Sequence, residues 1–272
     1  MPTAREPIHW RSRNSCSPIG DAITRLDVVL ALASFVAGFQ NALAGGGSFL
    51  TLPALLLTGL DSRAANVTST IALFPAQIAT GLAGRRHATG TRSLRLSTLC
   101  VLSVIGGGLG AGVLLKTPAD IFTALLPWLV LFTTLVFAWG NFFRRTDNIR
   151  SRLGPATAGL LQFAISVYGG YFGGGIGILM LAVLTLSGFA LRNAAATKNV
   201  LAGVINSSAV AIFAFSRDVA WKQAAVVAIA AIAGGQLGAY ALHRVNERVM
   251  RVCIVLLGAA LTIGLFVRYH AT

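Results

Sequence analysis

Two runs of three consecutive glycines could form a binding site for an anion. The first run, Gly45-Gly46-Gly47, is followed by Ser48, and the second run is Gly173-Gly174-Gly175. Each glycine weakens a helix by about 1 kcal/mol relative to alanine, so both runs predict helix breaks with free backbone N–H groups. A helix that begins after such a break directs the positive end of its dipole into it, where an anion is stabilised. We predict substrate contacts at all of these residues; the alternative is close helix packing through small residues.

Hydroxyl and amide side chains follow both glycine runs and could donate hydrogen bonds to an oxyanion. The first half has Asn66, Thr68 and Ser69, and the second half has Thr197 and, further along, Asn206. For the hydroxyls the alternative is an ordinary helix N-cap. For Asn206, and for Gln77 in the first half, the alternative is a hydrogen bond between packed helices. We predict that Asn206 and the other residues of both sets belong to the binding site.

Among the charged residues, Lys198 is the one whose position most specifically indicates a function. A lysine near the centre of a membrane costs about 2.5–3.5 kcal/mol on insertion scales, so such a residue is usually functional. It could pair with an anionic substrate or release a proton during transport. The alternative is a lysine whose stem lies along the helix end while its ammonium reaches the interface. Ser69 occupies the matching place in the first half, so a duplicated motif does not itself require the charge.

The acidic residues argue against a cation as cargo. The eight are Glu6, Asp21, Asp27, Asp61, Asp120, Asp147, Asp218 and Glu247. None of the eight lies in the interior of the apolar blocks described below, although Asp27 and Asp120 are the first residues of two of these blocks. Cation and proton transporters commonly place carboxylates inside the membrane. The basic residues that could approach a central site are Arg63, Arg192 and Lys198, which favours an anion.

The sequence shows no pattern expected of an enzyme. There is no His-Glu-x-x-His motif, no Ser/His or paired-carboxylate arrangement inside the apolar blocks, and no metal-ligand spacing among Cys16, Cys100 and Cys253. We predict no catalytic site, no metal and no cofactor. The net charge of +14 comes from Lys and Arg placed between the apolar blocks, which is typical of membrane topology and not of a nucleic-acid partner.

These residues are embedded in a chain that reads as a membrane protein. Hydrophobic residues make up 55% of it and charged residues only 11%. Several apolar blocks reach the 17–25 residues that a helix needs to cross hydrocarbon. The blocks cover residues 27–44, 49–60, 67–84, 96–115, 120–143, 156–172, 176–188, 200–216, 224–242 and 252–267. We predict an all-α, polytopic transmembrane protein of about eight to ten membrane segments.

An internal duplication organises these blocks. Gly45 recurs as Gly173 and Gly107-x-Leu-Gly-Ala as Gly235-x-Leu-Gly-Ala, each 128 positions later, and Arg63 with Thr68 recurs as Arg192 with Thr197, 129 positions later. The predicted divisions are a polar basic N-terminal tail at 1–26, a first transmembrane repeat at 27–143, a basic linker at 144–155, a second repeat at 156–267 and a C-terminal tail at 268–272.

The blocks 49–60 and 176–188 are too short for a comfortable crossing and follow the two glycine runs. Short or glycine-interrupted segments at matching places in two halves point to a transporter's binding site. If the short blocks are re-entrant, each half has four crossings and the repeats are parallel. If they cross, each half has five and the repeats are inverted. The basic loops favour inversion, whereas the basic N-terminal tail counts against it.

The chain resembles the TauE/SafE family of sulfite-exporter-like membrane transporters over about residues 27–267. The segments that carry the resemblance are Asn41–Ser48, Ala64–Thr70, Gly173–Gly177 and Arg192–Asn199. Thr197-Lys198 departs from the plainer Thr68-Ser69 form, so a strictly symmetric site does not follow. The resemblance implies export or uptake of small anions such as sulfite, sulfonates or related organosulfur compounds.

Together these observations predict a secondary transporter of a small anion in the cytoplasmic membrane of a bacterium. Its expected partners are the anion, the lipid bilayer and, as a candidate coupling ion, the proton. Two alternatives remain open from the sequence: a passive anion channel, and a membrane scaffold or sensor that transports nothing.

Overall fold

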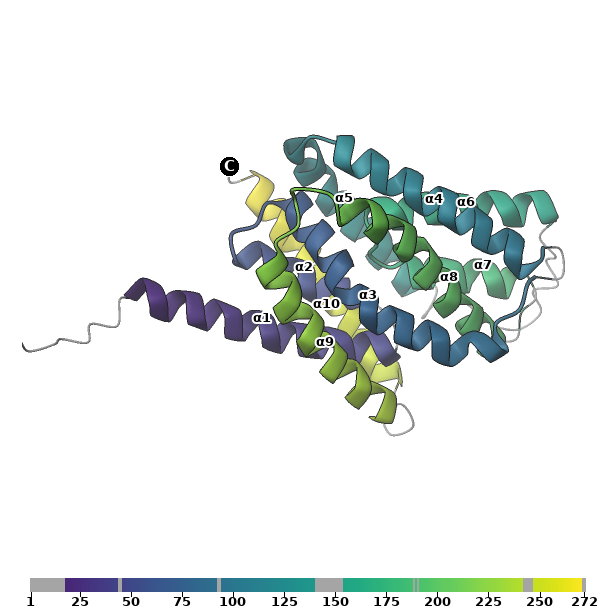
Figure 1. Ribbon diagram of the computed structural model, residues 1–272, viewed down its shortest axis with the longest axis horizontal. Coiled ribbons are helices and arrows are strands. Elements are labelled where there is room, and N and C mark those ends of the chain that lie inside the picture. Colours follow the sequence, from purple (N-terminus) through teal and green to yellow (C-terminus); the bar gives the residue numbers. More distant parts are fainter. Residues whose placement is uncertain are drawn as a thin grey trace, which may run out of the picture.

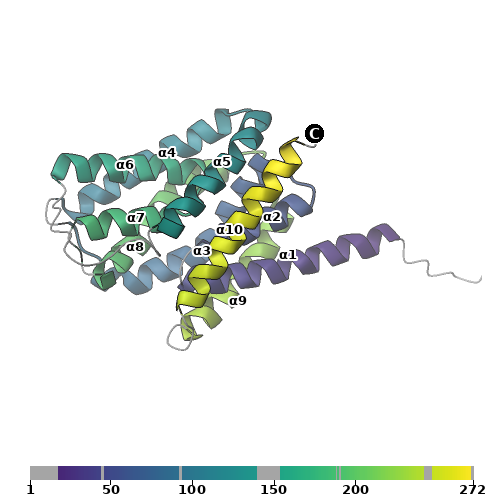
Figure 2. The same cartoon turned by 180° about the vertical axis from the view of Figure 1, so that it is seen from behind.

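The computed structural model describes residues 18–43, 46–91, 94–139, 154–187, 189, 191–241 and 247–270, and in these ranges the regular structure is entirely helical. The helices are α1 (Pro18–Leu43), α2 (Ser48–Leu57), α3 (Ser62–Gly84), the 3₁₀ turn η1 (Arg85–His87), α4 (Leu96–Lys116), α5 (Ala119–Ala138), α6 (Pro155–Tyr171), α7 (Ile176–Leu186), α8 (Leu191–Phe213), α9 (Trp221–Ala241) and α10 (Glu247–His270). Figures 1 and 2 show them from opposite sides. The predicted all-α class is confirmed. Most of the predicted N-terminal tail, nearly all of the linker and Gly45 lie outside the described residues.

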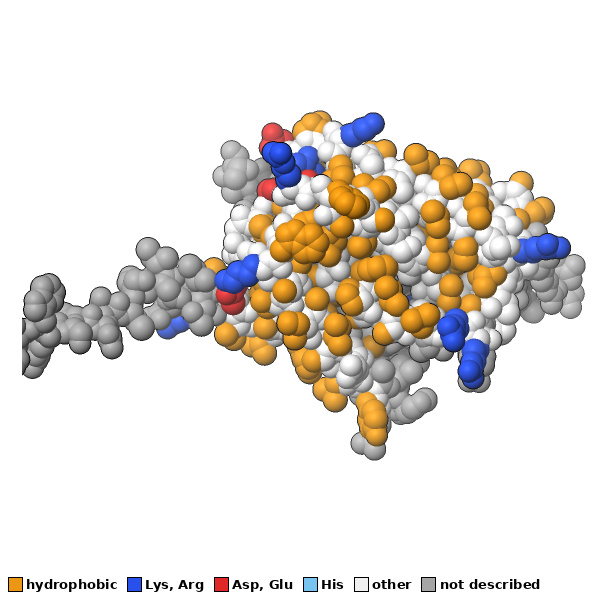
Figure 3. All heavy atoms as spheres, viewed as in Figure 1, with side chains coloured by type: hydrophobic (Ala, Val, Ile, Leu, Met, Phe, Trp, Pro, Cys, Tyr) orange, Lys and Arg blue, Asp and Glu red, His pale blue; other side chains and the backbone are white. Residues whose placement is uncertain are grey.

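The described helices are of the kind that crosses membranes. Three stretches are long and apolar enough to do so: Leu96–Lys116, Ala119–Val136 and Ala196–Phe213. Apolar side chains are spread across the face seen in Figure 3, while charged side chains lie towards its edges. Large apolar residues such as Leu109, Phe132 and Ile229 are exposed on the outer surface. This pattern fits a protein whose sides contact lipid.

Several helices begin earlier than the apolar blocks indicate. α1 begins at Pro18, before residue 27, and α3 begins at Ser62, before residue 67. The reason at α3 is an N-cap: Asp61 accepts hydrogen bonds from the backbone N–H groups of Arg63 (2.9 Å) and Ala64 (3.0 Å). Thr68 therefore lies inside α3, as Thr197 lies inside α8, and the N-cap alternative for these threonines is wrong.

Both glycine runs break the helices as predicted. α1 ends at Leu43 before α2 begins at Ser48, and α6 ends at Tyr171 before α7 begins at Ile176. Gly46, Gly173 and Gly175 have φ angles of 85°, 75° and 73°, a region that favours glycine. α2 has 10 residues and α7 has 11. At 1.5 Å per residue each is about 15 Å long, half of a hydrocarbon core.

α3 and α8, which are matching helices of the two repeats, run antiparallel. Near the start of α3, Arg63 bonds to Asp218, which follows the end of α8. Just beyond the end of α3, Thr89 bonds to Thr197 in the first part of α8. We call these two poles of the molecule the Arg63 end and the Arg85 end. Because equivalent helices point in opposite directions, the two repeats are inverted.

The same helix pairs form in both halves, which supports the duplication. α1 packs against α9, and its equivalent α6 packs against α4, the equivalent of α9. Glycines permit both contacts: a Cβ on Gly110 would lie 2.0 Å from the Val167 carbonyl oxygen, and one on Gly234 would lie 1.9 Å from that of Phe35. These in-helix glycines therefore allow close packing of the helices.

Each broken helix forms a hairpin that enters and leaves the molecule at one end. α1 starts at the Arg63 end, where Asp27 pairs with Lys222 of α9, and α2 leads back there into α3. α6 and α7 form the equivalent hairpin from the Arg85 end. The short helices are thus re-entrant in inverted repeats, a combination that the sequence count did not include. The predicted number of crossings in each repeat was wrong because it counted α1 as a helix that crosses the membrane, whereas α1 and α2 together enter and leave at one end.

Candidate functional site

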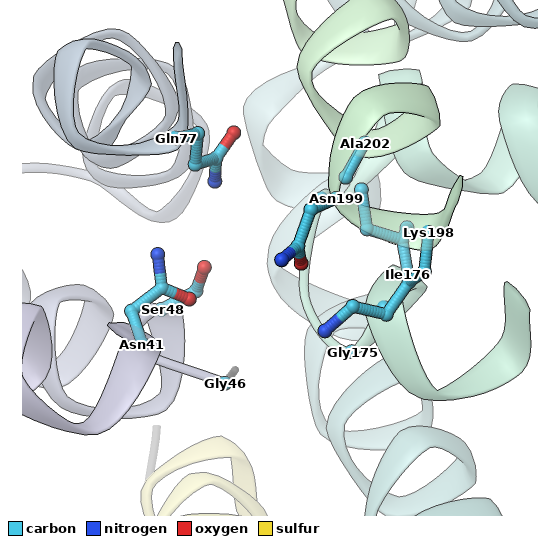
Figure 4. A pocket seen from close by; sticks show the side chains of 11 residues that line it. Asn41, Gly46, Ser48, Gln77, Gly175, Ile176, Lys198, Asn199 and Ala202 are labelled. Carbon is cyan, nitrogen blue, oxygen red and sulfur yellow. The ribbon is translucent and has the colours of Figure 1, made fainter. Parts of the chain in front are cut away.

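A polar cavity lies where the two glycine breaks meet. It is lined by Asn41, Gly46, Ser48, Gln77, Gly173, Gly175, Ile176, Gly177, Lys198, Asn199 and Ala202, and its volume is about 50 Å³. Figure 4 shows Asn41, Ser48 and Gln77 on one side and Lys198 with Asn199 on the other. These two sides come from different repeats: α1, α2 and α3 in the first, α8 in the second. The cavity is therefore an interface between the repeats.

The cavity wall is polar and contains a basic side chain. Lys198 is the ionisable residue in its lining, beside three carboxamides and the Ser48 hydroxyl. The Lys198 side chain lies along Gly177: a Cβ added to Gly177 would lie 3.4 Å from Cδ of the lysine. The helices α2 and α7 begin at Ser48 and Ile176, and both residues line the cavity. The N–H groups of Phe49 and Leu50 in α2 donate to the carbonyl oxygens of Gly46 and Gly47, each at 3.0 Å, so what both helix starts direct towards the cavity is the positive end of a helix dipole.

Bulky neighbours enforce the glycine geometry. A Cβ on Gly175 would lie 1.7 Å from Cγ2 of Thr133 in α5, so only glycine fits there. The carbonyl oxygen of Gly46 accepts a hydrogen bond from Nε2 of Gln40 at 3.3 Å, and that of Gly47 accepts one from Thr51 at 3.4 Å. These contacts hold the backbone of the breaks in place beside the cavity.

The structure brings some of the predicted site residues together at the cavity. Those in its lining are Gly46, Ser48, Gly173, Gly175 and Lys198. Gly47 is packed against the backbone of Ala37, and Gly174 is packed against the Phe172 ring. Both therefore support the walls of the cavity.

The predicted polar residues on α3 bond to protein groups. Asn66 donates from Nδ2 to the carbonyl oxygen of Tyr171 at 3.2 Å, which ties α3 to the end of α6. Ser69 shares a 2.7 Å hydrogen bond with Thr51 and is 3% exposed. Neither side chain lines the cavity, so both position the helices that form it.

Thr68 and Thr197 make reciprocal contacts between the repeats. The Thr68 hydroxyl accepts a hydrogen bond from the N–H of Ala220, just before α9, at 3.1 Å. The Thr197 hydroxyl accepts one from the N–H of Thr89, before α4, at 3.0 Å and donates to its carbonyl oxygen at 3.1 Å. Each threonine thus holds a loop of the opposite repeat, one at each end of the molecule.

Asn206 and Gln77 occupy matching positions, 129 residues apart, and bond to each other. Nδ2 of Asn206 donates to Oε1 of Gln77. A pair of equivalent residues in contact marks the pseudo-twofold axis that relates the repeats. Gln77 also lines the cavity, so the axis passes beside the candidate site.

Sequence reasoning missed several residues of the cavity wall. The predicted contacts did not include five of the residues that line the cavity: Asn41, Ile176, Gly177, Asn199 and Ala202. Gln77 was considered, with a hydrogen bond between packed helices as the alternative, but it was not predicted as a contact. A signal was available for some of them, since Asn41 stands one turn before the first break and Asn199 adjoins Lys198. Ala202 and Ile176 carry no polar group that could have revealed them.

Two inverted repeats of membrane helices, with broken helices that meet at a polar cavity between them, are the architecture of a membrane transporter. Sequence comparison agrees with this class and narrows it. The family described as sulfite exporter TauE/SafE matches residues 30–265. The chain belongs to this family.

Relatives in the family cover most of the chain. A probable membrane transporter protein of Haemophilus influenzae is 31% identical over 237 residues, which is 86% of this chain and 92% of the relative. Another, from Sinorhizobium sp, is 31% identical over 250 residues, 90% of this chain and 94% of the relative. The probable membrane transporter protein YfcA of Escherichia coli is 27% identical over 244 residues, 89% and 90% of the two chains. No solved structure matches the chain.

Proposed function

We propose that this protein is a secondary transporter that binds a small anion in the cavity between its repeats. The observation that carries the proposal is the position of Lys198, which lines a polar cavity beside the starts of two broken helices. An ammonium group and two positive helix ends in a site shielded from water attract an anion strongly. Sulfite, sulfonates and related organosulfur anions are the proposed cargo, and the bacterial cytoplasmic membrane is the proposed location.

The size and chemistry of the cavity support a small, singly charged ligand. About 50 Å³ is room for a few water molecules, since one water needs about 10–15 Å³ on this scale. One lysine can neutralise one negative charge. The carboxamides of Asn41, Gln77 and Asn199 can complete the hydrogen bonds of the oxyanion without adding charge.

The predicted site residues that the structure describes have three different roles in this proposal. Gly46, Ser48, Gly173, Gly175 and Lys198 contact the anion. Gly47, Gly174, Asn66 and Ser69 keep the breaks in shape, and Thr68, Thr197 and Asn206 join the repeats. Rocking of one repeat against the other then exposes the cavity to each side of the membrane in turn.

The test of the site is Lys198→Met, which removes the charge but keeps an unbranched side chain. Purified protein is heated with sulfite, sulfate, thiosulfate, sulfonates and carboxylates, and the shift in unfolding temperature gives the preferred anion. We expect Lys198→Met to weaken binding of that anion about thirtyfold or more, as expected when one partner of a shielded charge pair is lost. Without anion, the variant should be more stable than the wild type, by up to about 2 kcal/mol, because a charge inside the membrane is costly.

Lys222→Met is the matched control, because Lys222 is an exposed lysine paired with Asp27, and neither residue lines the cavity. It should keep the anion-induced shift. Equal anion binding by Lys198→Met and the wild type would contradict the proposed site.

Transport itself is tested in sealed vesicles that contain the purified protein. Accumulation of the preferred anion against its gradient excludes a passive channel, and comparison with and without an imposed proton gradient identifies proton coupling. If the protein neither binds nor moves any anion of the panel, and Lys198→Met changes nothing, the scaffold or sensor alternative is supported instead.

A further inference from the structure

The two ends of the transporter are closed by unequal sets of contacts. At both ends a threonine of one repeat bonds to the backbone of a loop in the other: Thr68 to Ala220 at the Arg63 end, and Thr197 to Thr89 at the Arg85 end. Besides the exposed pair of Lys222 and Asp27, the Arg63 end has a less exposed ion pair. Nη2 of Arg63 lies 3.0 Å from Oδ1 of Asp218.

The ion pair joins three elements from both repeats. Nη1 of Arg63 donates to the carbonyl oxygen of Thr117, at the end of α4, at 2.9 Å. The other carboxylate oxygen of Asp218 accepts a hydrogen bond from the Ser216 hydroxyl at 3.1 Å. The side chains of Arg63 and Asp218 are 22% and 20% exposed, so water screens the pair less than it screens a surface pair. The contact therefore fastens the start of α3 and the end of α4 to the loop between α8 and α9.

The loop before α4, at the Arg85 end, lacks the residues for an equivalent pair. Positions 89 and 90, which match Asp218 in the two repeat offsets, are Thr89 and Gly90. The whole stretch 85–95 contains no Asp or Glu. The arginine that matches Arg63, Arg192, therefore has no carboxylate available in the loop that the inverted symmetry would place opposite it.

We propose that Arg63 and Asp218 form a gate that has no counterpart among the described residues of the Arg85 end, so the empty transporter opens preferentially to the Arg85 end. Opening to the Arg63 end must separate the ion pair of Arg63 and Asp218 as well as a threonine contact, whereas the described residues of the Arg85 end form a threonine contact without an ion pair. The residues that touch the cargo lie elsewhere, so Arg63 and Asp218 act on transport by positioning the repeats. The inference rests on alternating access but not on the identity of the cargo.

A reporter thiol in the cavity tests the gate. Ser48→Cys is placed in a background whose native cysteines, Cys16, Cys100 and Cys253, are changed to serine. A thiol reagent that cannot cross membranes is applied to each side of sealed vesicles without added anion. Surface reporters at Lys116→Cys and Arg86→Cys identify the sides of the Arg63 end and the Arg85 end.

We expect faster labelling of the cavity thiol from the Arg85 end. Asp218→Asn should raise the labelling rate from the Arg63 end by about fivefold or more, the lower range of a conformational coupling. Asp120→Asn is the matched control, because Asp120 is an exposed carboxylate in the first turn of α5 at the same end. It should leave the rate unchanged. Exchange of the two charges, Arg63→Asp with Asp218→Arg, should restore slow labelling.

The proposal is overturned if Asp218→Asn leaves labelling from the Arg63 end unchanged, or if it raises labelling equally from both ends. If Asp218→Asn fails to fold, the charge-exchanged protein decides: restored folding with slow labelling supports the gate, and folding with fast labelling contradicts it. Because no anion is present, the outcome is independent of whether Lys198 binds one.

Discussion

Lys198 and Ser69 occupy matching positions of the two repeats but have different surroundings. Ser69 is buried and shares a hydrogen bond with Thr51, whereas Lys198 reaches the cavity wall. The second repeat therefore supplies the charge of the candidate site, and the first repeat supplies neutral groups such as Asn41 and Gln77. An anion bound here would be held off the pseudo-twofold axis, closer to α8. The duplicated fold is thus used asymmetrically.

Gly175 offers a residue-scale prediction about the second break. Gly175→Ala should destabilise the protein by about 2–3 kcal/mol, because alanine is strained at a φ of 73° and its Cβ would overlap the Thr133 side chain. Thermal unfolding in detergent measures the loss. The control is Gly112→Ala in α4, where an added Cβ meets nothing within 4 Å, and this variant should be as stable as the wild type or more so. Equal stability of Gly175→Ala and Gly112→Ala would contradict the enforced break.

At the residue scale, the sequence predicted what depends on unusual residue types. Paired glycine runs and a lysine in an apolar context are costly and therefore informative, and the structure places residues from both runs beside Lys198. Partners in space were not predictable. The hydroxyls of Thr68 and Thr197 could serve an anion or a backbone group equally well, and only the fold shows that Ala220 and Thr89 are within reach.

At the element scale, the contact between α8 and the loop before α4 makes a separate prediction. Valine has nearly the same shape as threonine, but Thr197→Val leaves the N–H and carbonyl groups of Thr89 without their side-chain partner. We expect a loss of about 1–2 kcal/mol and faster thiol labelling of Ala88→Cys in this loop. Thr197→Ser keeps the hydroxyl and should behave like the wild type. Identical unfolding temperatures for the valine and serine variants would show that the contact contributes nothing.

Helix existence was predictable from the apolar blocks, but helix starts and the path of the chain were not. Hydropathy does not detect a polar first turn, so it placed the start of α3 at residue 67, although the Asp61 cap begins the helix at Ser62. Hydropathy also gives no direction to a short segment. It could not tell that α1 and α2 enter and leave at the same end, and this pairing sets the parity of the repeats.

At the scale of the whole molecule, the inverted repeats explain why contacts occur in pairs. Exchange of the repeats converts the Thr68 contact into the Thr197 contact and leaves the pair of Gln77 and Asn206 unchanged. A contact that maps onto itself can persist while the two ends open in turn. Contacts that the exchange of repeats converts into each other, such as those of Thr68 and Thr197, are expected to break and form in turn. The centre of α3 and α8 is therefore the natural pivot for rocking.

The charges at the two ends predict the orientation in the membrane. The described residues at the Arg63 end include both signs: Lys116, Arg217 and Lys222 with Asp27, Asp61 and Asp120. The loop at the Arg85 end carries Arg85, Arg86, Arg92 and Arg95 and no acidic residue, and the connection between α5 and α6 contains Arg144, Arg145, Arg150 and Arg152 with the single acidic residue Asp147. Short loops rich in Lys and Arg face the cytoplasm, so we expect the Arg85 end inside the cell. In intact cells, an impermeant thiol reagent should label Lys116→Cys and spare Arg86→Cys, and both should react after the cells are opened. Labelling of Arg86→Cys alone in intact cells would reverse the orientation and show that the basic N-terminal sequence outweighs the loops.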